Sequence, residues 1–281
     1  MKLLHDKRSV IGEGPVWCEA EKLLYYVNGF ENEIIKTDIT SGEYKVLTLP
    51  FAVPALGFSK DGRMIVTTFD GVYYLSENFE KTPLYDTEKY SILYGNDSKV
   101  GPDGRYYVGT QSAKYFGASD KVDGKLCSID KDGNVKIVLD GLLLSNGFDW
   151  SMDEKYLYHT DSPTNIIKEY EFDKKEGTAI FTGRQIEIPG VDGFTIDREN
   201  CLLVTSGLGK IFRINTADFT CVDEYEVNAK YTASCGFCGE NTDILAVVTS
   251  RYKLCVEKNP GAGLTYVRKM EVPGRKPYLF G

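Results

Sequence analysis

The sequence predicts an all-β protein, a six-bladed β-propeller with four-stranded antiparallel blades in a single domain over residues 1–281. Three observations lead to this fold class. One pattern, an apolar pair followed by a turn rich in Asp, Gly or Asn and then an aromatic or β-branched run, occurs six times. Each repeat holds about four short strand signals, and no window of about a dozen residues has a helical period. Repeats of about 40 to 50 residues with four strands each are typical of propeller blades.

The six repeats follow one another without a linker, and one apolar anchor residue marks each of them. The anchors are Trp17, Phe58, Val100, Trp150, Ile196 and Phe237, at spacings of 41, 42, 50, 46 and 41 residues. After the anchors, the turns lead into strand signals at residues 23–27, 64–66, 106–108, 156–158, 202–204 and 244–247. Later strands are visible as well: in the third repeat 125–129 and 135–139 flank a turn, and in the fourth 166–172 follows 156–160.

The two ends of the chain differ from the repeats. The last strand signals are 264–268 and 269–272, and they precede a short tail. The N-terminal segment Lys7–Ile11 has no blade of its own. We expect it to pair into the last blade and close the ring, because this N-terminal strand would remove an open sheet edge.

Charge and hydropathy exclude several classes of partner. The net charge of −8 and the pI near 5.0 argue against nucleic acid and against an anionic membrane. No segment approaches the roughly 18 apolar residues that a membrane span needs. His5–Arg8 is polar where a signal peptide would need its apolar stretch. The sequence therefore predicts a soluble, cytoplasmic protein, and it leaves the oligomeric state open.

The cysteines and histidines narrow the chemistry. Seven Cys is an odd number and far below the density of a disulfide scaffold, so we expect reduced, mostly buried thiols. Only two His are present, and a Ser-His-Asp or Cys-His mechanism would have to use His5 or His159. A zinc site rich in His is impossible. The sequence therefore favours chemistry by carboxylates, amides and a metal ion.

The register of the repeats indicates a site. In a propeller the first strand of each blade lines the central channel, and the loop entering it lies at one mouth. The residues four positions before the anchors are Glu13, Pro54, Asn96, Asn146, Asp192 and Ala233. Four of these six are oxygen donors of the kind that hard divalent cations prefer. Asn-Gly and Asp-Gly are also common turn dipeptides, so any one alone is more often structural; four in one register favour a site.

Several motifs resemble one known family. Motifs of the SMP-30/gluconolactonase/luciferin-regenerating enzyme family resemble several segments of this chain, in the family's order and over essentially its whole length. These segments are 11–17, the pair Asn96-Asp97 with 101–110, 145–151, 158–162 and 192–197. The resemblance implies a six-bladed propeller hydrolase, of the sugar lactonase type, with one divalent cation. It implies that Glu13, Asn146 and Asp192 hold the metal, and that Asn96 lies beside it and contacts the substrate or bound water.

Two positions depart from the pattern of that family. Sugar lactonases of the family often have an Arg two residues before the Asn of the Asn-Asp motif, and here the residue is Tyr94. Some also have a Glu near the place where Lys114 falls. Both positions are expected to contact substrate, and Lys114 could equally be a solvated loop lysine. Loss of the bidentate Arg and reversal of the charge at Lys114 change which polar groups of a substrate can be hydrogen-bonded. The sequence therefore does not identify which lactone is the substrate.

The expected reaction is hydrolysis of a lactone, a sugar aldonolactone in the family, to the hydroxy acid. The cation polarises the ring carbonyl and lowers the pKa of a bound water. Asp192 deprotonates or orients that water, and Asn96 donates its amide to the carbonyl or its oxyanion. The donor types suit Ca²⁺, Mg²⁺ or Mn²⁺, although Zn²⁺ or Fe²⁺ could occupy the site. Two alternatives stay open: another ester or organophosphate hydrolase on the same metal site, and a non-catalytic propeller that binds a protein partner.

Two further motifs are interpreted as structural. Cys235 and Cys238 form a lone CxxC, which lacks both the second pair of a zinc site and the βαβ context of a redox site. His159 lies in a strand two residues before Asp161, with no nucleophile on that face, and we expect it to be packed or hydrogen-bonded.

Overall fold

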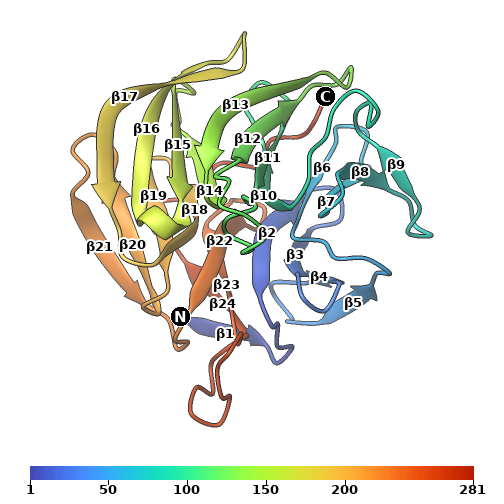
Figure 1. The fold of residues 1–281 in the computed structure, drawn as a ribbon. Coiled ribbons are helices and arrows are strands. Elements are labelled where there is room, and N and C mark those ends of the chain that lie inside the picture. The colour runs from blue at the N-terminus through green and yellow to red at the C-terminus, as the bar shows by residue number, and fades with distance from the viewer. The chain divides into compact units, whose positions relative to one another are not determined.

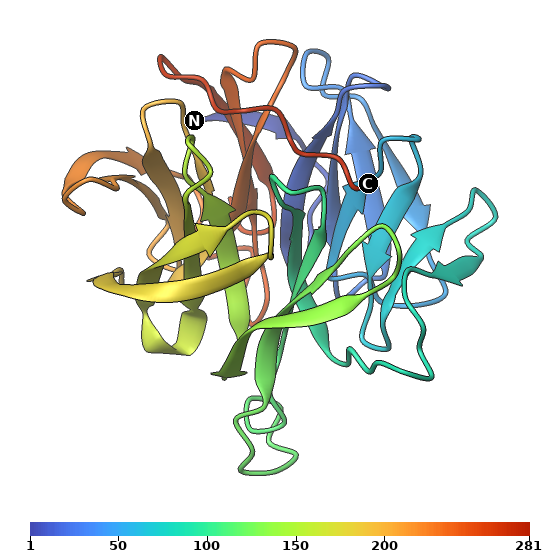
Figure 2. The same ribbon diagram turned by 90° about the horizontal axis from the view of Figure 1, so that it is seen from above.

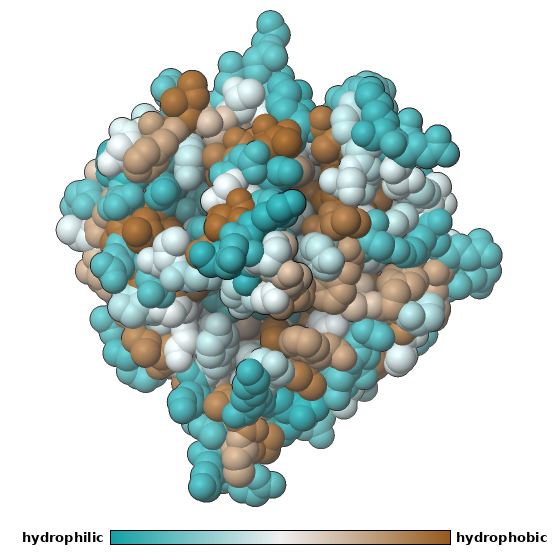
Figure 3. Space-filling view, viewed as in Figure 1, coloured by the Kyte–Doolittle hydropathy of each residue, from teal (hydrophilic) through white to brown (hydrophobic).

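The protein consists almost entirely of β-strands. The structure is a computed structural model that describes residues 1–281, with 24 strands and one short 3₁₀ helix, η1 (Ser162–Thr164). The strands form six four-stranded antiparallel sheets, the blades of a six-bladed β-propeller (Figure 1), which confirms the predicted fold class. No helix in it has the length and apolar character needed to cross a membrane. The surface is mostly hydrophilic, with small separate hydrophobic patches on the face shown in Figure 3.

The chain divides into two compact units, each with three blades. Unit 1 comprises Met1–Ala52 and Ile188–Pro277, and unit 2 comprises Val53–Glu187 and Tyr278–Gly281. The single domain over residues 1–281 stays a prediction.

The blades of unit 1 are the first, fifth and sixth along the chain. The first consists of β2 (Gly12–Cys18), β3 (Leu23–Asn28), β4 (Glu33–Thr37) and β5 (Tyr44–Thr48). The fifth consists of β18 (Val191–Ile196), β19 (Cys201–Ser206), β20 (Lys210–Asn215) and β21 (Cys221–Glu226). The sixth consists of β22 (Thr232–Cys238), β23 (Ile244–Thr249), β24 (Thr265–Lys269) and β1 (Lys2–His5).

The blades of unit 2 are the second, third and fourth. The second consists of β6 (Ala55–Phe58), β7 (Met64–Thr67), β8 (Val72–Leu75) and β9 (Lys81–Pro83). The third consists of β10 (Gly95–Val100), β11 (Tyr106–Thr110), β12 (Gly124–Ile129) and β13 (Val135–Leu142). The fourth consists of β14 (Ser145–Trp150), β15 (Tyr156–Asp161), β16 (Ile166–Asp173) and β17 (Thr178–Glu187).

The register predicted from the repeats is confirmed. Every anchor residue lies at or next to the end of the first strand of its blade, β2, β6, β10, β14, β18 or β22. The strand signals that follow the anchors are the second strands of the same blades. The residues four positions before the anchors therefore lie at the start of a first strand or, for Pro54, directly before it.

The N-terminal strand pairs into the last blade, but its predicted position was wrong. β1 is Lys2–His5 instead of Lys7–Ile11, and it pairs antiparallel with β24 as the fourth strand of the sixth blade (Figure 1). The segment after it, Lys7–Ile11, forms no strand and connects β1 to β2. The Arg8 guanidinium anchors this segment by donating to the carbonyl oxygens of Ala262 and Pro260. Within this segment only Ile11 makes a β-bridge, to Ser250.

The predicted strand at 269–272 does not form. β24 ends at Lys269, and the Met270 amide donates outside the ladder to the Asp243 carbonyl at 2.8 Å. Pro273 follows shortly after, and proline has no amide hydrogen with which to extend a sheet.

The core lies between neighbouring blades within each unit. In unit 2, Trp150 is fully buried between the third and fourth blades, and its ring meets that of Tyr107 edge-on at 4.8 Å. In unit 1, Leu203 and Phe237 belong to one buried cluster between the fifth and sixth blades. Large apolar and aromatic side chains on facing sheets therefore hold the first strands at fixed positions.

Candidate functional site

Five of the six first strands contain a β-bulge near their start. The register shifts between Glu13 and Val16 in β2, Gly95 and Ser98 in β10, Asn146 and Phe148 in β14, Val191 and Phe194 in β18, and Thr232 and Ser234 in β22, whereas β6 is regular. All four predicted oxygen donors lie at these bulges. A bulge places an extra residue on one strand and redirects its side chain, which is why bulges are frequent beside active sites.

The two carboxylates belong to unit 1. Glu13 is half-buried in β2, between Gly12 and Gly14, and Gly14 has a φ of +54°. Asp192 in β18 is buried, and the Tyr231 hydroxyl donates to its Oδ2 at 3.2 Å. Both strands pack against β22. The structure therefore places Glu13 and Asp192 on the two strands that flank β22.

Close packing of the fifth blade on the sixth explains the residue that follows Asp192. A Cβ at Gly193 would collide with the Ser234 hydroxyl and lie 2.8 Å from the Ser234 Cβ. Glycine is therefore required where β18 approaches β22, and Asp192 is held beside this contact.

The two amides belong to unit 2. Asn146 in β14 is buried and pairs with Thr160 of β15. Asn96 in β10 is half-buried, and its Nδ2 donates to the Ser145 carbonyl at 3.1 Å. The Gln111 Nε2 donates to the Asn96 Oδ1 at 3.3 Å. These bonds orient the Asn96 amide, use one of its two N–H groups, and bring Asn96 next to the strand that carries Asn146.

Asp97 is a further candidate, beyond the four donors predicted from the repeats. Burial raises the pKa of its carboxyl, and the Lys99 ammonium partly opposes this shift. Lys99 itself is paired with the buried Asp149 at 2.9 Å. A carboxyl that retains a proton at higher pH than usual, one residue from Asn96, is typical of functional sites. The Asn-Asp dipeptide was the sequence signal.

Tyr94 and Lys114, the predicted substrate contacts, differ in their relation to Asn96. Tyr94 directly precedes β10, and its carbonyl accepts a hydrogen bond from the Gln111 amide at 2.9 Å, so Gln111 joins Tyr94 to Asn96. Lys114 is exposed in the loop between β11 and β12, which projects beyond its own strands (Figure 2). Its ammonium makes no hydrogen bond or ion pair, as expected of a solvated loop lysine.

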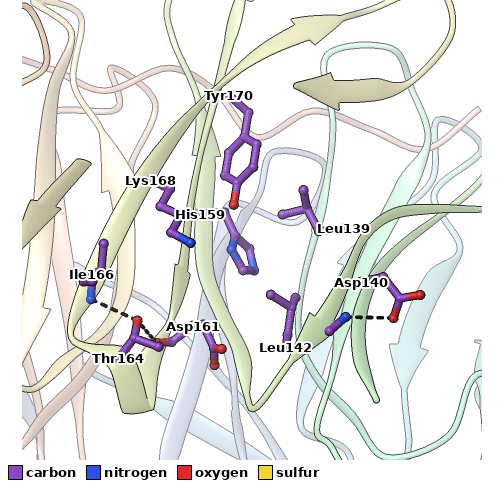
Figure 4. A pocket seen from close by; sticks show the side chains of 10 residues that line it. Leu139, Asp140, Leu142, His159, Asp161, Thr164, Ile166, Lys168 and Tyr170 are labelled. Atoms are coloured by element: carbon purple, nitrogen blue, oxygen red, sulfur yellow. Dashed lines mark hydrogen bonds between the residues drawn. The ribbon is translucent and has the colours of Figure 1, made fainter. Parts of the chain in front are cut away.

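Unit 2 also contains a cavity of about 310 Å³ between β13 and the strands β15 and β16 (Figure 4). His159, Asp161 and Lys168 are among the side chains that line it. The His159 Nε2 lies 2.8 Å from the Oγ of Ser145, which is completely buried. Burial lowers the pKa of His159 to about 3. His159 is therefore a neutral, packed and hydrogen-bonded side chain, as predicted, and its serine partner is not accessible to a substrate.

The CxxC pair is part of the packing of the sixth blade. All seven cysteines are free thiols. Cys235 and Cys238 are buried, and their thiols donate to the carbonyl oxygens of Leu203 and Ile244. Burial raises the pKa of Cys238 to about 12, so its thiolate is not populated at neutral pH.

Comparisons with known proteins give a family match over most of the chain. The model of the SMP-30/gluconolactonase/LRE-like region matches residues 11–251. The 6-deoxy-6-sulfogluconolactonase of Pseudomonas putida is 25% identical to this chain and covers 100% of it, with 98% of its own length matched. Human regucalcin is 26% identical over 96% of this chain and 94% of its own. A solved structure of regucalcin from Agrobacterium tumefaciens, described as a calcium-binding protein, matches 100% of this chain and 97% of its own with a TM-score of 0.87 at 25% identity.

Proposed function

Because the chain belongs to the SMP-30/gluconolactonase/LRE-like family, we propose that it is a metal-dependent hydrolase that opens the ring of a small-molecule lactone. The observation that carries this proposal is the position of four oxygen donors, Glu13, Asn96, Asn146 and Asp192, each at a bulge at the start of a first strand. The lactonase among the relatives supports the reaction class.

The residues fit one hard divalent cation by their chemistry. Glu13, Asn146 and Asp192 would hold it, with two carboxylates to balance its charge and an amide oxygen as a third donor. No group of three or more His, Cys, Asp and Glu side chains is arranged to hold a metal ion, so the proposed set includes the Asn146 amide. When bound, the cation supplies Lewis acidity toward the lactone carbonyl. Ca²⁺, Mg²⁺ and Mn²⁺ suit these ligands, and the calcium-binding relative makes Ca²⁺ the first ion to test.

Asn96 would stabilise the negative charge that develops on the lactone carbonyl oxygen. One N–H of its amide is held by the Ser145 carbonyl, and the other is directed by the Gln111 contact to Oδ1. A preorganised donor of this kind contributes about 2.7–4 kcal/mol to transition-state stabilisation in other hydrolases.

Asp192 would orient the attacking water and accept its proton. The Tyr231 hydroxyl bonded to Oδ2 fixes the plane of this carboxylate. Service as a metal ligand reduces the basicity of a carboxylate, so orientation of the water is the larger part of the role that we assign to Asp192.

Metal removal followed by add-back tests this proposal. Rates of proton release from glucono-, galactono- and δ-valerolactone are measured on purified protein, before and after chelation, and again after Ca²⁺, Mg²⁺, Mn²⁺ or Zn²⁺ is restored. We expect turnover that disappears with the metal and returns with one of these ions. An aryl ester and a phosphotriester are measured beside the lactones, and hydrolysis of one of these alone would replace the substrate class. Stoichiometric metal with no hydrolysis of any of these compounds would reject the enzyme in favour of a binding module.

A further inference from the structure

Four aromatic side chains in unit 2 gather at the exposed loops beside Asn96. They are Phe69, Tyr94, Tyr115 and Phe116, and each is between 43% and 51% exposed. The Phe116 ring lies at the centre of this aromatic cluster, with ring centroids 4.9 Å from Tyr94, 6.4 Å from Phe69 and 6.5 Å from Tyr115. Three separate loops therefore contribute to one half-exposed aromatic surface.

Backbone and side-chain hydrogen bonds connect this cluster to Asn96. The Tyr94 amide donates to the Phe69 carbonyl at 2.8 Å, and the Gln111 amide donates to the Tyr94 carbonyl at 2.9 Å. The side chain of the same Gln111 donates to the Asn96 Oδ1 at 3.3 Å. The cluster is thus held in a fixed position relative to the amide that we assign to the lactone carbonyl.

The chemistry of the cluster indicates what it binds. Soluble proteins rarely leave several large apolar side chains in one exposed group unless the group contacts a ligand or partner. Phe69 and Phe116 have no polar atom, and Tyr94 and Tyr115 add one hydroxyl each, so the cluster offers few hydrogen bonds to the hydroxyl groups of a sugar. The adjacent Asp70 forms an ion pair with Lys81 at 2.8 Å, which partly neutralises its charge.

We propose that the aromatic cluster binds an apolar substituent of the substrate, so that the preferred substrates are lactones with an alkyl or aryl group on the ring. This inference rests on the proposed lactone hydrolysis and names its substrate class. The occupant is the substrate itself because Gln111 hydrogen-bonds both the Tyr94 carbonyl in the cluster and the Asn96 Oδ1. An aldonolactone, with a hydroxyl on almost every carbon, is the weaker ligand for such a surface.

The backbone of Tyr94 provides a sharp variant. Its φ of +56° is a left-handed conformation that glycine adopts readily and a bulky side chain does not. Tyr94→Gly therefore removes the ring and places at this position a residue that adopts the conformation without strain. Phe79, in the turn between β8 and β9, has a φ of +65° and supplies the matched control, Phe79→Gly.

The experiment compares three lactones of the same ring size: δ-valerolactone, δ-decalactone and glucono-δ-lactone. We expect the wild-type KM for δ-decalactone to be lower than that for δ-valerolactone by about tenfold or more, because its five-carbon chain is partly buried on the cluster. Phe116→Ala and Tyr94→Gly should each remove most of this difference by raising the KM for δ-decalactone far more than that for δ-valerolactone. Phe116→Leu should retain most of the difference, and Phe79→Gly should retain all of it.

Two results would overturn the inference. One is equal KM values for δ-decalactone and δ-valerolactone with glucono-δ-lactone preferred. The other is a Phe116→Ala variant that lowers kcat/KM equally for all three lactones, which would assign the cluster to folding or to a macromolecular partner.

A binding arm separates this inference from the proposed function. The δ-lactam with the same five-carbon chain as δ-decalactone is not hydrolysed, and its binding is measured by calorimetry against unsubstituted δ-valerolactam. Preferential binding that Phe116→Ala abolishes supports the cluster as a binding surface even if no lactone is turned over. No preference for the substituted lactam rejects it even if lactones are hydrolysed.

Discussion

The fifth and sixth blades, which pack together in unit 1, share a bulge at the start of the first strand and differ in the residue that it holds. In β18 the residue is the carboxylate Asp192, and in β22 it is Ala233. Ala233 is fully buried, and its carbonyl accepts a hydrogen bond from the Thr205 hydroxyl at 2.8 Å. The bulge is therefore a property of the blade, and the chemistry depends on which side chain stands at it. The second blade, whose first strand β6 is regular and is preceded by Pro54, shows that a blade also forms without a bulge and without an oxygen donor.

Truncation at these two equivalent positions should have the most unequal effects. Asp192→Ala removes a proposed metal ligand and the group that orients water, and we expect kcat/KM for lactone hydrolysis to fall by about a thousandfold or more. Ala233→Gly also deletes the side chain at a bulge, but we expect about 0.5–1 kcal/mol of lost stability and activity within about threefold of wild type. Initial rates at saturating metal, with the metal content of each protein, provide the measurement. Retention of activity within about tenfold in Asp192→Ala would reject the assigned role.

The contact between the two blades allows a second, smaller test. Gly193→Ala introduces a Cβ that collides with Ser234 of β22 and displaces β18 beside Asp192. We expect a loss of about 1–3 kcal/mol in the free energy of unfolding and a fall of about tenfold in kcat/KM. Ser234→Gly removes the colliding atoms, so the double variant should recover most of both losses. Denaturant unfolding and kinetics on the two single variants and the double variant form the cycle. Strictly additive effects would show that the close approach does not position Asp192.

The sequence predicted the blades because the anchors repeat, but it did not predict the bulges. An anchor such as Trp150 is fully buried and ends its strand, so hydrophobicity alone locates it. A strand of about six residues has too few alternating side chains to reveal a shift of one residue in register. Asn146 and Asp192 were selected from their position in the repeat, and the reason that their side chains leave the ladder became visible only in the strand pairing.

Features made by loops were beyond sequence reasoning for a different reason. Phe69, Tyr94 and Phe116 come from three loops with no periodic pattern, and only the fold brings their rings together. The N-terminal strand was misplaced because β1 offers only Leu3 and Leu4 as an apolar signal. Its partner, β24, lies at the other end of the chain, and such a long-range pairing leaves no local trace.

The sixth blade also differs from the fifth in its closure by a strand from the far end of the chain, and His5 makes this closure sensitive to acid. His5 ends β1, where its buried ring stacks on Tyr26 with centroids 6.0 Å apart and contacts Tyr44 at 4.9 Å. Burial lowers its pKa from 6.5 to about 4, against the weaker opposing effect of the neighbouring Asp6. As the pH falls below 6.5, the unfolded chain binds the proton before the folded chain does. The stability contributed by neutral His5 is thus complete above pH 6.5, and it decreases as the pH falls from 6.5 to about 4.

His5→Phe isolates this contribution because it keeps an aromatic ring against Tyr26 and Tyr44 and removes the titration. Between pH 7 and pH 5 we expect the free energy of unfolding of the wild type to fall by about 2 kcal/mol more than that of His5→Phe. His159 also has a lowered pKa, but it is present in both proteins and cancels in the difference. Urea unfolding at the two pH values gives the measurement, and hydrogen exchange of the β1 amides shows whether the loss is local to the closing strand. Equal pH dependence in the two proteins would mean that β1 holds the sixth blade together without any linkage to the charge of His5.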